Sequence, residues 1–103
     1  MKGVLSGGEV VDVVFELLVP GVAVQKLGRR GIAIADVQQL PWNENVTTHD
    51  PGTDVKGRRL LIGRTDGGQV LTLVIERTLD PTTWLVITGW TATGSERRMI
   101  DYD

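Results

Sequence analysis

Three β-rich runs joined by tight turns constrain the fold of this chain more than any other feature. The runs, Arg59–Arg64, Gln69–Arg77 and Trp84–Trp90, are dominated by the branched, aliphatic and aromatic side chains that suit a pleated sheet. Asp66-Gly67-Gly68 lies between the first two runs and offers the positive φ that a tight hairpin needs. Asp80-Pro81 marks the next reversal. Successive strands with short connections predict an antiparallel β meander.

The first half of the chain predicts one strand and two short helices. Valines and a phenylalanine favour a strand near Val11–Leu18, although the polar positions there recur at helical spacing. Pro20 suits the first position of a helix, and Gly28 or Gly31 suits its end. A second short helix over Ile34–Leu40 stops before the next proline. The apolar face expected for the first helix consists of Val22, Ala23 and Leu27.

The remaining segments complete a small α+β domain. Trp42–Gly57 is rich in turn-forming residues and is expected to be a polar connector. Thr93 followed by Glu96 forms a capping-box pattern, which predicts a last helix over Gly94–Tyr102. The expected order is therefore strand, two helices, three strands and a helix, in a single domain over residues 9–103 after a flexible lead-in over 1–8.

Composition excludes several kinds of site. The 103 residues include no cysteine, so disulfides, thiolate metal sites and a cysteine nucleophile are ruled out. His49 is the single histidine, and no convergent set of ligands surrounds it in the sequence, so we expect neither a metal nor a cofactor. Gly63–Gly68 lacks the lysine and the Ser/Thr of a nucleotide-binding loop and reads as a hairpin turn.

The apolar stretch Val10–Val24 is too interrupted to be a signal peptide or a membrane span. Asp12, Glu16 and Pro20 break it, whereas a span needs about 20 apolar residues with few charges. We therefore expect a cytoplasmic protein with no membrane partner, which the absence of cysteine also favours.

Charge is distributed unevenly along the chain. The formal net charge is −2, yet residues 56–98 contain seven of the eleven Lys and Arg residues against four Asp and Glu. An acidic protein with this distribution can still present a basic patch to a polyanion.

Arg64 has two interpretations. It shares a strand face with Leu60 and Ile62, and a cation among apolar side chains needs a partner. The structural interpretation pairs it with an acidic side chain such as Glu76, and the functional one gives it an anionic ligand. Arg59 should point to the opposite face, because the two arginines are an odd number of residues apart.

Two tryptophans fall in the last predicted strand. Trp84 and Trp90 are six residues apart, and a regular strand would place them on one face. Each could pack in the core or form a hot spot of a partner interface.

A series of short segments resembles the BrnT-like toxins of bacterial type II toxin–antitoxin systems, within the RelE/ParE group. The resemblance spans about residues 15–102 and keeps the order of the family's motifs. In chain order, the segments are Phe15-Glu16, Arg29-Arg30-Gly31-Ile32, His49-Asp50-Pro51, Leu61-Ile62-Gly63-Arg64, Glu76-Arg77, and Ala92-Thr93 with Glu96-Arg97 and Tyr102.

The resemblance implies a small, metal-independent endoribonuclease that arrests translation until a cognate antitoxin binds it. Arg64 would stabilise the scissile phosphate, and Glu76 would accept a proton from the ribose. Arg29 and Arg30 stand where the family has lysine and histidine and would also be catalytic. Further RNA-binding cations are expected at Arg59, Arg77 and Arg97.

Two departures from the family pattern keep a second hypothesis open. Arg30 replaces a histidine, and arginine does not exchange protons at neutral pH. Trp90-Thr91 replaces two arginines, which removes two phosphate-binding charges. The alternative is a non-catalytic protein-interaction module on the same fold. In either case Trp90 is expected to lie at an interface with an antitoxin or with a second copy of the chain.

Overall fold

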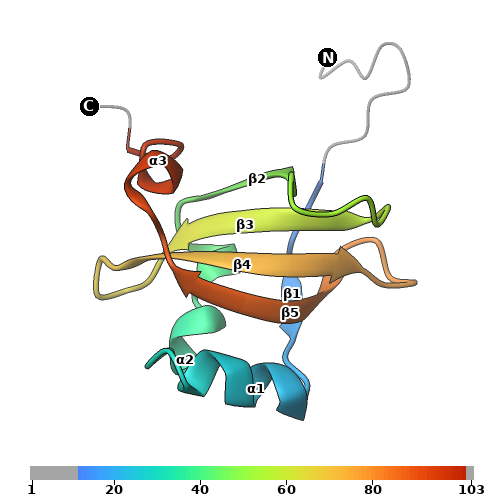
Figure 1. Ribbon diagram of the computed structural model, residues 1–103, viewed down its shortest axis with the longest axis horizontal. Helices are drawn as coiled ribbons and strands as arrows, with labels where there is room; N and C mark the ends of the chain where they lie inside the picture. The colour runs from blue at the N-terminus through green and yellow to red at the C-terminus, as the bar shows by residue number, and fades with distance from the viewer. Residues whose placement is uncertain (1–11, 102–103) are drawn as a thin grey trace.

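Five strands form one sheet in the order β1-β5-β4-β3-β2, with helical segments packed against it (Figure 1). The computed structural model describes residues 12–101, so the predicted lead-in over 1–8 lies outside the described residues. The strands are β1 (Glu16–Leu18), β2 (Asn45–His49), β3 (Arg58–Arg64), β4 (Val70–Arg77) and β5 (Thr83–Thr91). The helical elements are α1 (Gly21–Gly28), α2 (Ile34–Val37), the 3-10 turn η2 (Leu40–Trp42) and α3 (Gly94–Arg97).

The predicted α+β class and the meander of β3, β4 and β5 are confirmed. Both strand pairs are antiparallel. In the turn between β3 and β4, Gly68 has a φ of +90°, and the Thr65 amide donates to the Gln69 carbonyl at 2.8 Å. The glycine therefore provides the backbone conformation that the sequence pattern required.

The prediction of a polar connector over Trp42–Gly57 was wrong in its middle. Strand β2 lies within it and pairs antiparallel with β3, with Thr47 opposite Leu61. Val46, Thr47 and Thr48 are β-branched and suit a strand, but the turn-forming residues around them hid this signal. Polar residues are tolerated because β2 is an edge strand.

The N-terminal strand is shorter than predicted, and it is parallel to its neighbour. The predicted strand covered Val11–Leu18, whereas β1 covers only Glu16–Leu18; Val11 lies outside the described residues. Strand β1 pairs in parallel with the start of β5, so the sheet is mixed rather than purely antiparallel. Before β1, the Val13 carbonyl accepts a hydrogen bond from the Trp84 indole at 3.0 Å.

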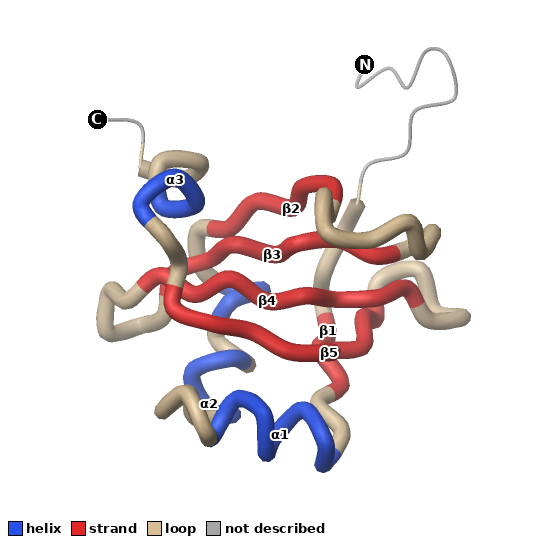
Figure 2. Tube along the Cα trace, in the orientation of Figure 1, coloured by secondary structure: helices blue, strands red, loops and turns tan. Residues whose placement is uncertain are grey.

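The two N-terminal helices lie on the same side of the sheet, as Figure 2 shows. Ala23 and Leu27 of α1 are buried as expected, but Val22 is 61 % exposed, so its assignment to the apolar face was wrong. The predicted helix over Ile34–Leu40 is divided into α2 and η2, and its proline falls inside η2. Proline is tolerated there because the first turn of a helix needs no amide donor.

The last helix ends earlier than predicted. Helix α3 stops at Arg97 instead of continuing to Tyr102. After α3 the backbone forms tighter turns, in which hydrogen bonds join residues three apart. The Met99 amide donates to the Glu96 carbonyl, and the Ile100 amide donates to the Arg97 carbonyl. Ile100, which follows these turns, is buried against the sheet.

Each face of the sheet has its own apolar cluster. The helical face carries the larger one, in which residues of β3, β4 and β5 meet α1, α2 and η2; it includes Ala23, Leu27, Val37, Leu40, Leu61, Leu71, Leu73, Ile75, Trp84 and Val86. On the opposite side, here called the α3 face, Ile62 and Val70 pack with Ile100. Burial of each large aliphatic side chain contributes about 1.5–3 kcal/mol.

A β-bulge separates the two tryptophans. Val74 pairs with Thr88 but Ile75 pairs with Val86, so Ile87 is an extra residue in β5. Because the bulge inserts one residue, each side chain of β5 after it points to the face opposite to the one that regular alternation from Trp84 would give. Trp84 is therefore buried on the helical face while Trp90 lies half-buried on the α3 face, and the prediction that they share a face was wrong.

Substitution of Gly89 tests how closely β5 packs against its neighbours. A Cβ there would lie 2.6 Å from Leu73 Cδ2 and 2.9 Å from the Thr72 carbonyl oxygen. Gly89→Ala should lower the free energy of urea unfolding by about 1–3 kcal/mol, as overpacking does. The control is Gly28→Ala, where a Cβ meets nothing within 4 Å and the helix should be unchanged or stabilised. Equal stability of the two variants would contradict this packing.

Candidate nucleic-acid interface

The register of β3 and β4 assigns the predicted site residues to two ends of the sheet. Arg64 pairs with Val70 where β3 ends and β4 begins, and we call this the Arg64 end. Glu76 pairs with Arg58 at the other end, here called the Glu76 end. Six residues along β4 correspond to about 20 Å. The predicted phosphate-binding arginine and the predicted proton acceptor are therefore not brought together.

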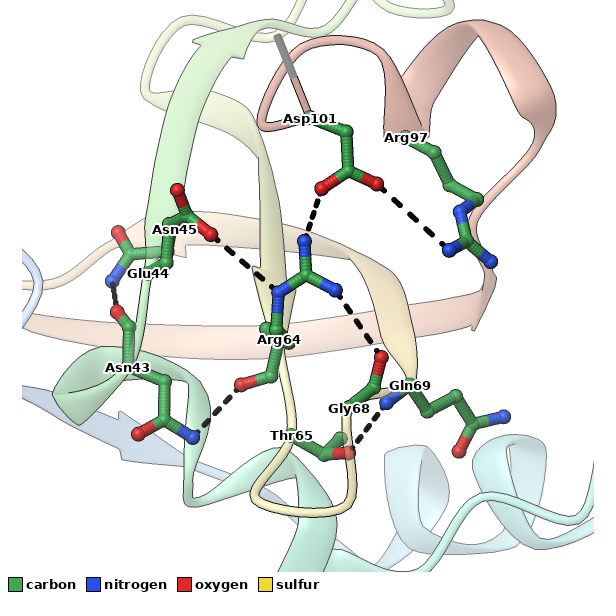
Figure 3. A network of polar contacts seen from close by, with 9 residues as sticks. All are labelled: Asn43, Glu44, Asn45, Arg64, Thr65, Gly68, Gln69, Arg97 and Asp101. Carbon is green, nitrogen blue, oxygen red and sulfur yellow. Dashed lines mark hydrogen bonds and ion pairs between the residues drawn. The ribbon is translucent and has the colours of Figure 1, made fainter. Parts of the chain in front are cut away.

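Arg64 is surrounded by oxygen atoms of three segments (Figure 3). Its guanidinium contacts the Asp101 carboxylate, donates to the Gly68 carbonyl at 3.3 Å and lies 3.5 Å from Glu44 Oε1. Arg97 of α3 is 3.8 Å from the same Asp101. The suggested partner, Glu76, was wrong, because the acids that face Arg64 come from the segment before β2 and from the chain after α3.

Glu76 has a partner of its own. The Arg58 guanidinium donates to its carboxylate at 2.8 Å, and both side chains are about one-third exposed. A general base must approach the proton it removes to within hydrogen-bond distance. Glu76 can serve only a substrate bound at the Glu76 end.

Arg59 and Arg77 are held together by one carboxylate on the helical face. Asp12 accepts from Arg59 Nε at 2.9 Å and from Arg77 Nη2 at 2.6 Å. The Arg77 guanidinium also lies 4.8 Å from the centre of the Trp84 ring. These contacts give Arg59 and Arg77 a structural role, which is to hold Asp12 against the sheet at the Glu76 end.

Three further cations converge on a shallow pocket beside β5, which we call the α1 pocket. Its volume is about 330 Å³, and it is lined by Lys26, Arg29, Arg30 and Thr88. Within residues 12–101 none of the three cations has a carboxylate within 4 Å. Lys26 lies in the last turn of α1, Arg29 is its C-cap and Arg30 follows the cap, so all three are near the helix C-terminus, where the helix dipole favours positive charge.

Arg30 connects this pocket to the strand. Its Nη1 donates to the Gly89 carbonyl at 2.6 Å, and its guanidinium carbon lies 6.0 Å from the centre of the Trp90 ring. Because Gly89 is two residues before the end of β5, the α1 pocket belongs to the Arg64 end. Sequence reasoning selected Arg29 and Arg30 but missed Lys26 and Thr88. The helical spacing of the three cations was the available signal for Lys26.

Glu96 fixes the side chain of Trp90. Its Oε1 accepts from the Trp90 indole at 3.0 Å, from the Thr72 hydroxyl at 2.9 Å and from the Thr93 amide at 2.8 Å. Burial alone would raise the pKa of Glu96, but the hydrogen bonds outweigh it and lower this pKa below its ordinary value. The carboxylate is a stable anion suited to positioning rather than to proton transfer. Trp90 as a partner interface stays a prediction.

Comparisons with protein-family models, curated proteins and solved structures find no match to this chain. Over residues 12–101, no three His, Cys, Asp or Glu side chains gather where they could hold a metal ion. Across the same residues, every helix is too short or too polar to cross a membrane. The cations at the Arg64 end are therefore the feature of the described residues that points to a ligand.

Removal of the capping box tests how α3, at the Arg64 end, is stabilised. Thr93 Oγ1 accepts from the Glu96 amide, and the Glu96 carboxylate accepts from the Thr93 amide. Thr93→Ala should therefore cost about 1 kcal/mol in the free energy of unfolding, the usual value for a lost cap. Thr93→Ser retains the hydroxyl and should keep most of the stability. A neutral Thr93→Ala would show that this cap does not stabilise α3.

The lowered pKa of Glu96 predicts a pH dependence of stability. A group whose folded pKa lies below its unfolded value, here near 4.5, stabilises the protein fully above that pH. The contribution is lost as the pH falls through the folded pKa. The difference in unfolding free energy between the wild type and Glu96→Gln should be constant above about pH 5.5 and should shrink below about pH 4.5. Urea unfolding of both proteins from pH 3 to 7 measures it, and a difference independent of pH would contradict the assignment.

Proposed function

We propose that this protein binds RNA at the Arg64 end of the sheet and acts as a toxin-like, metal-independent endoribonuclease. In this proposal it inhibits translation by RNA cleavage and is neutralised by a cognate antitoxin. The observation that carries the RNA contact is the α1 pocket, whose three cations have no carboxylate partner within residues 12–101. Unpaired cations around a concave surface attract phosphate groups, which supply most of the affinity for a nucleic acid.

Arg64 and Arg97 would extend this phosphate-binding surface. They lie at the same end of the sheet as the α1 pocket, but Arg64 is on the α3 face whereas the pocket is beside α1, so an RNA strand that contacts both groups has to pass around this end of the sheet. The Asp101 carboxylate forms an ion pair with Arg64 and lies 3.8 Å from the Arg97 guanidinium. An RNA phosphate has the charge and the acceptor oxygens to take the place of that carboxylate.

The cleavage step in this proposal depends on arginine. When a ribose 2′-hydroxyl attacks the neighbouring phosphate, negative charge develops on the phosphate oxygens, and a guanidinium aimed at them lowers the barrier. Arg64 and the α1 pocket can supply such a guanidinium. Glu76 does not take part, because Arg58 holds it at the opposite end.

The position of Glu76 favours a second candidate function, which is RNA binding without cleavage. The resemblance named Glu76 as the proton acceptor, and no contact brings it near the cations at the Arg64 end. Incubation of the wild type and of Glu76→Gln with a labelled RNA distinguishes the two functions. The proposed ribonuclease cleaves the RNA, and Glu76→Gln cleaves it at the same rate because the cations that act lie at the other end. If the wild type binds RNA but leaves it intact over hours, the binding function is the correct one.

RNA binding by the α1 pocket is tested by removing its charges. Arg29→Gln combined with Arg30→Gln should weaken binding of a labelled single-stranded RNA by at least tenfold at low salt and should flatten the salt dependence. The control is Lys56→Gln, which removes an exposed charge from the loop before β3 at the Glu76 end. Equal affinity of the double variant and the control would contradict the proposed site.

Arg64 is tested against a matched arginine. Arg64→Ala should abolish RNA cleavage or growth arrest while the thermal midpoint stays within a few degrees, because its partners are surface carboxylates. Arg58→Ala serves as the control, since both arginine side chains are 28 % exposed and each pairs with a carboxylate. Loss of folding in Arg64→Ala, or equal loss of activity in both variants, would assign Arg64 a structural role.

A further inference from the structure

The outer edge of β5 is only partly covered by a neighbouring strand. Strand β1 pairs with Thr83–Leu85 alone, and β5 continues to Thr91 (Figure 2). Within residues 12–101 the second half of β5 has no strand on this side. An uncovered edge presents backbone donors and acceptors that can pair with another extended segment.

Hydrogen bonds identify which backbone groups face outward. The Gly89 carbonyl accepts from the Arg30 side chain, so it points away from β4. The Ala92 amide donates to the Val70 carbonyl at 3.0 Å and therefore points toward β4. Outward and inward residues alternate along a strand. Gly89 and Thr91 thus direct their amides away from β4, and no backbone partner of either amide occurs among the described residues. Thr91 is exposed, whereas Gly89 is buried and its carbonyl is covered by Arg30, which must move before a strand can pair there.

The charge beside this edge selects the kind of strand that could pair with it. Lys26, Arg29 and Arg30 flank the open half of β5, and Thr88 lies in the same pocket. A second copy of the chain would bring two such sets of cations together, and like charges across a strand pair are destabilising. A strand with acidic side chains would instead compensate these charges while its backbone completes the sheet.

We propose that the open half of β5 accepts an extended, acidic segment of a different protein as an added strand. The backbone of Gly89 and Thr91 pairs with the segment, and its carboxylates contact the cations of the α1 pocket. Arg30 leaves the Gly89 carbonyl to bind one of them. This interaction does not depend on RNA binding, although a bound segment would cover the same cations.

The test uses an eight-residue synthetic peptide that alternates glutamate and valine, added to the full chain. The peptide should bind and slow hydrogen exchange of the Gly89 and Thr91 amides at least tenfold. A matched peptide of lysine and valine should bind at least tenfold more weakly. The glutamate–valine peptide with alternate amides N-methylated, which retains the charge but cannot pair as a strand, should also bind at least tenfold more weakly.

Two variants of one residue test the backbone contact from the protein side. Thr91→Pro removes an outward amide that β4 does not use, and proline is tolerated at sheet edges. It should weaken peptide binding at least tenfold, whereas Thr91→Val keeps the amide and should bind as the wild type does. Circular dichroism establishes that both variants are folded, and the N-methylated peptide tests the same contact without altering the protein.

Several results would overturn this proposal without affecting RNA binding, which is measured separately on the same samples. They are no binding of the glutamate–valine peptide, equal binding of its N-methylated form, or unchanged exchange of the Gly89 and Thr91 amides when it binds. Concentration-dependent protection of these amides without peptide, accompanied by a dimer in sedimentation, would show that a second copy is the occupant instead.

Discussion

The pairing of β4 with β3 on one side and β5 on the other determines where the functional side chains of this protein lie. Val70–Ile75 of β4 are buried, so the apolar clusters of both faces fix its register. That register places Arg64 and Glu76 at opposite ends of the sheet. The bulge at Ile87 adds a second constraint, because it presents Trp90 on the α3 face while Gly89 stays beneath α1.

This geometry separates the paired arginines of the Glu76 end from the cations of the α1 pocket. Arg58, Arg59 and Arg77 at the Glu76 end are all paired with carboxylates. At the Arg64 end, the cations of the α1 pocket have no such partners within residues 12–101. Cations without a carboxylate partner contribute little to the stability of the fold. An anionic ligand would therefore bind most favourably at the α1 pocket, where no carboxylate of the described residues competes with it.

Local patterns in the sequence predicted much of the fold. The meander was found because its strands are apolar and its turns carry glycine, and the α3 cap because Thr93 and Glu96 lie three residues apart. Strand β2 was missed because a polar edge strand between turn formers has no apolar alternation. The tryptophan faces were assigned wrongly because no local signal marks a bulge.

The candidate site was harder to predict than the fold because its contacts are long-range. The Asp101 carboxylate reaches Arg64 across 37 residues, and the Gly89 carbonyl meets Arg30 across 59. Residue spacing could group Arg29 with Arg30, but only the packing of α1 against β5 brings Thr88 to them. The separation of Glu76 from Arg64 likewise follows from strand register rather than from residue type.

The central claim is that RNA phosphates bind the cations of the α1 pocket. Side-chain NMR of the isotopically labelled protein during titration with a single-stranded RNA tests this claim most directly. We predict that the largest shifts occur at the side chains of Lys26, Arg29 and Arg30. Shifts confined to Arg59 and Arg77, or no shifts at all at low salt, would contradict it.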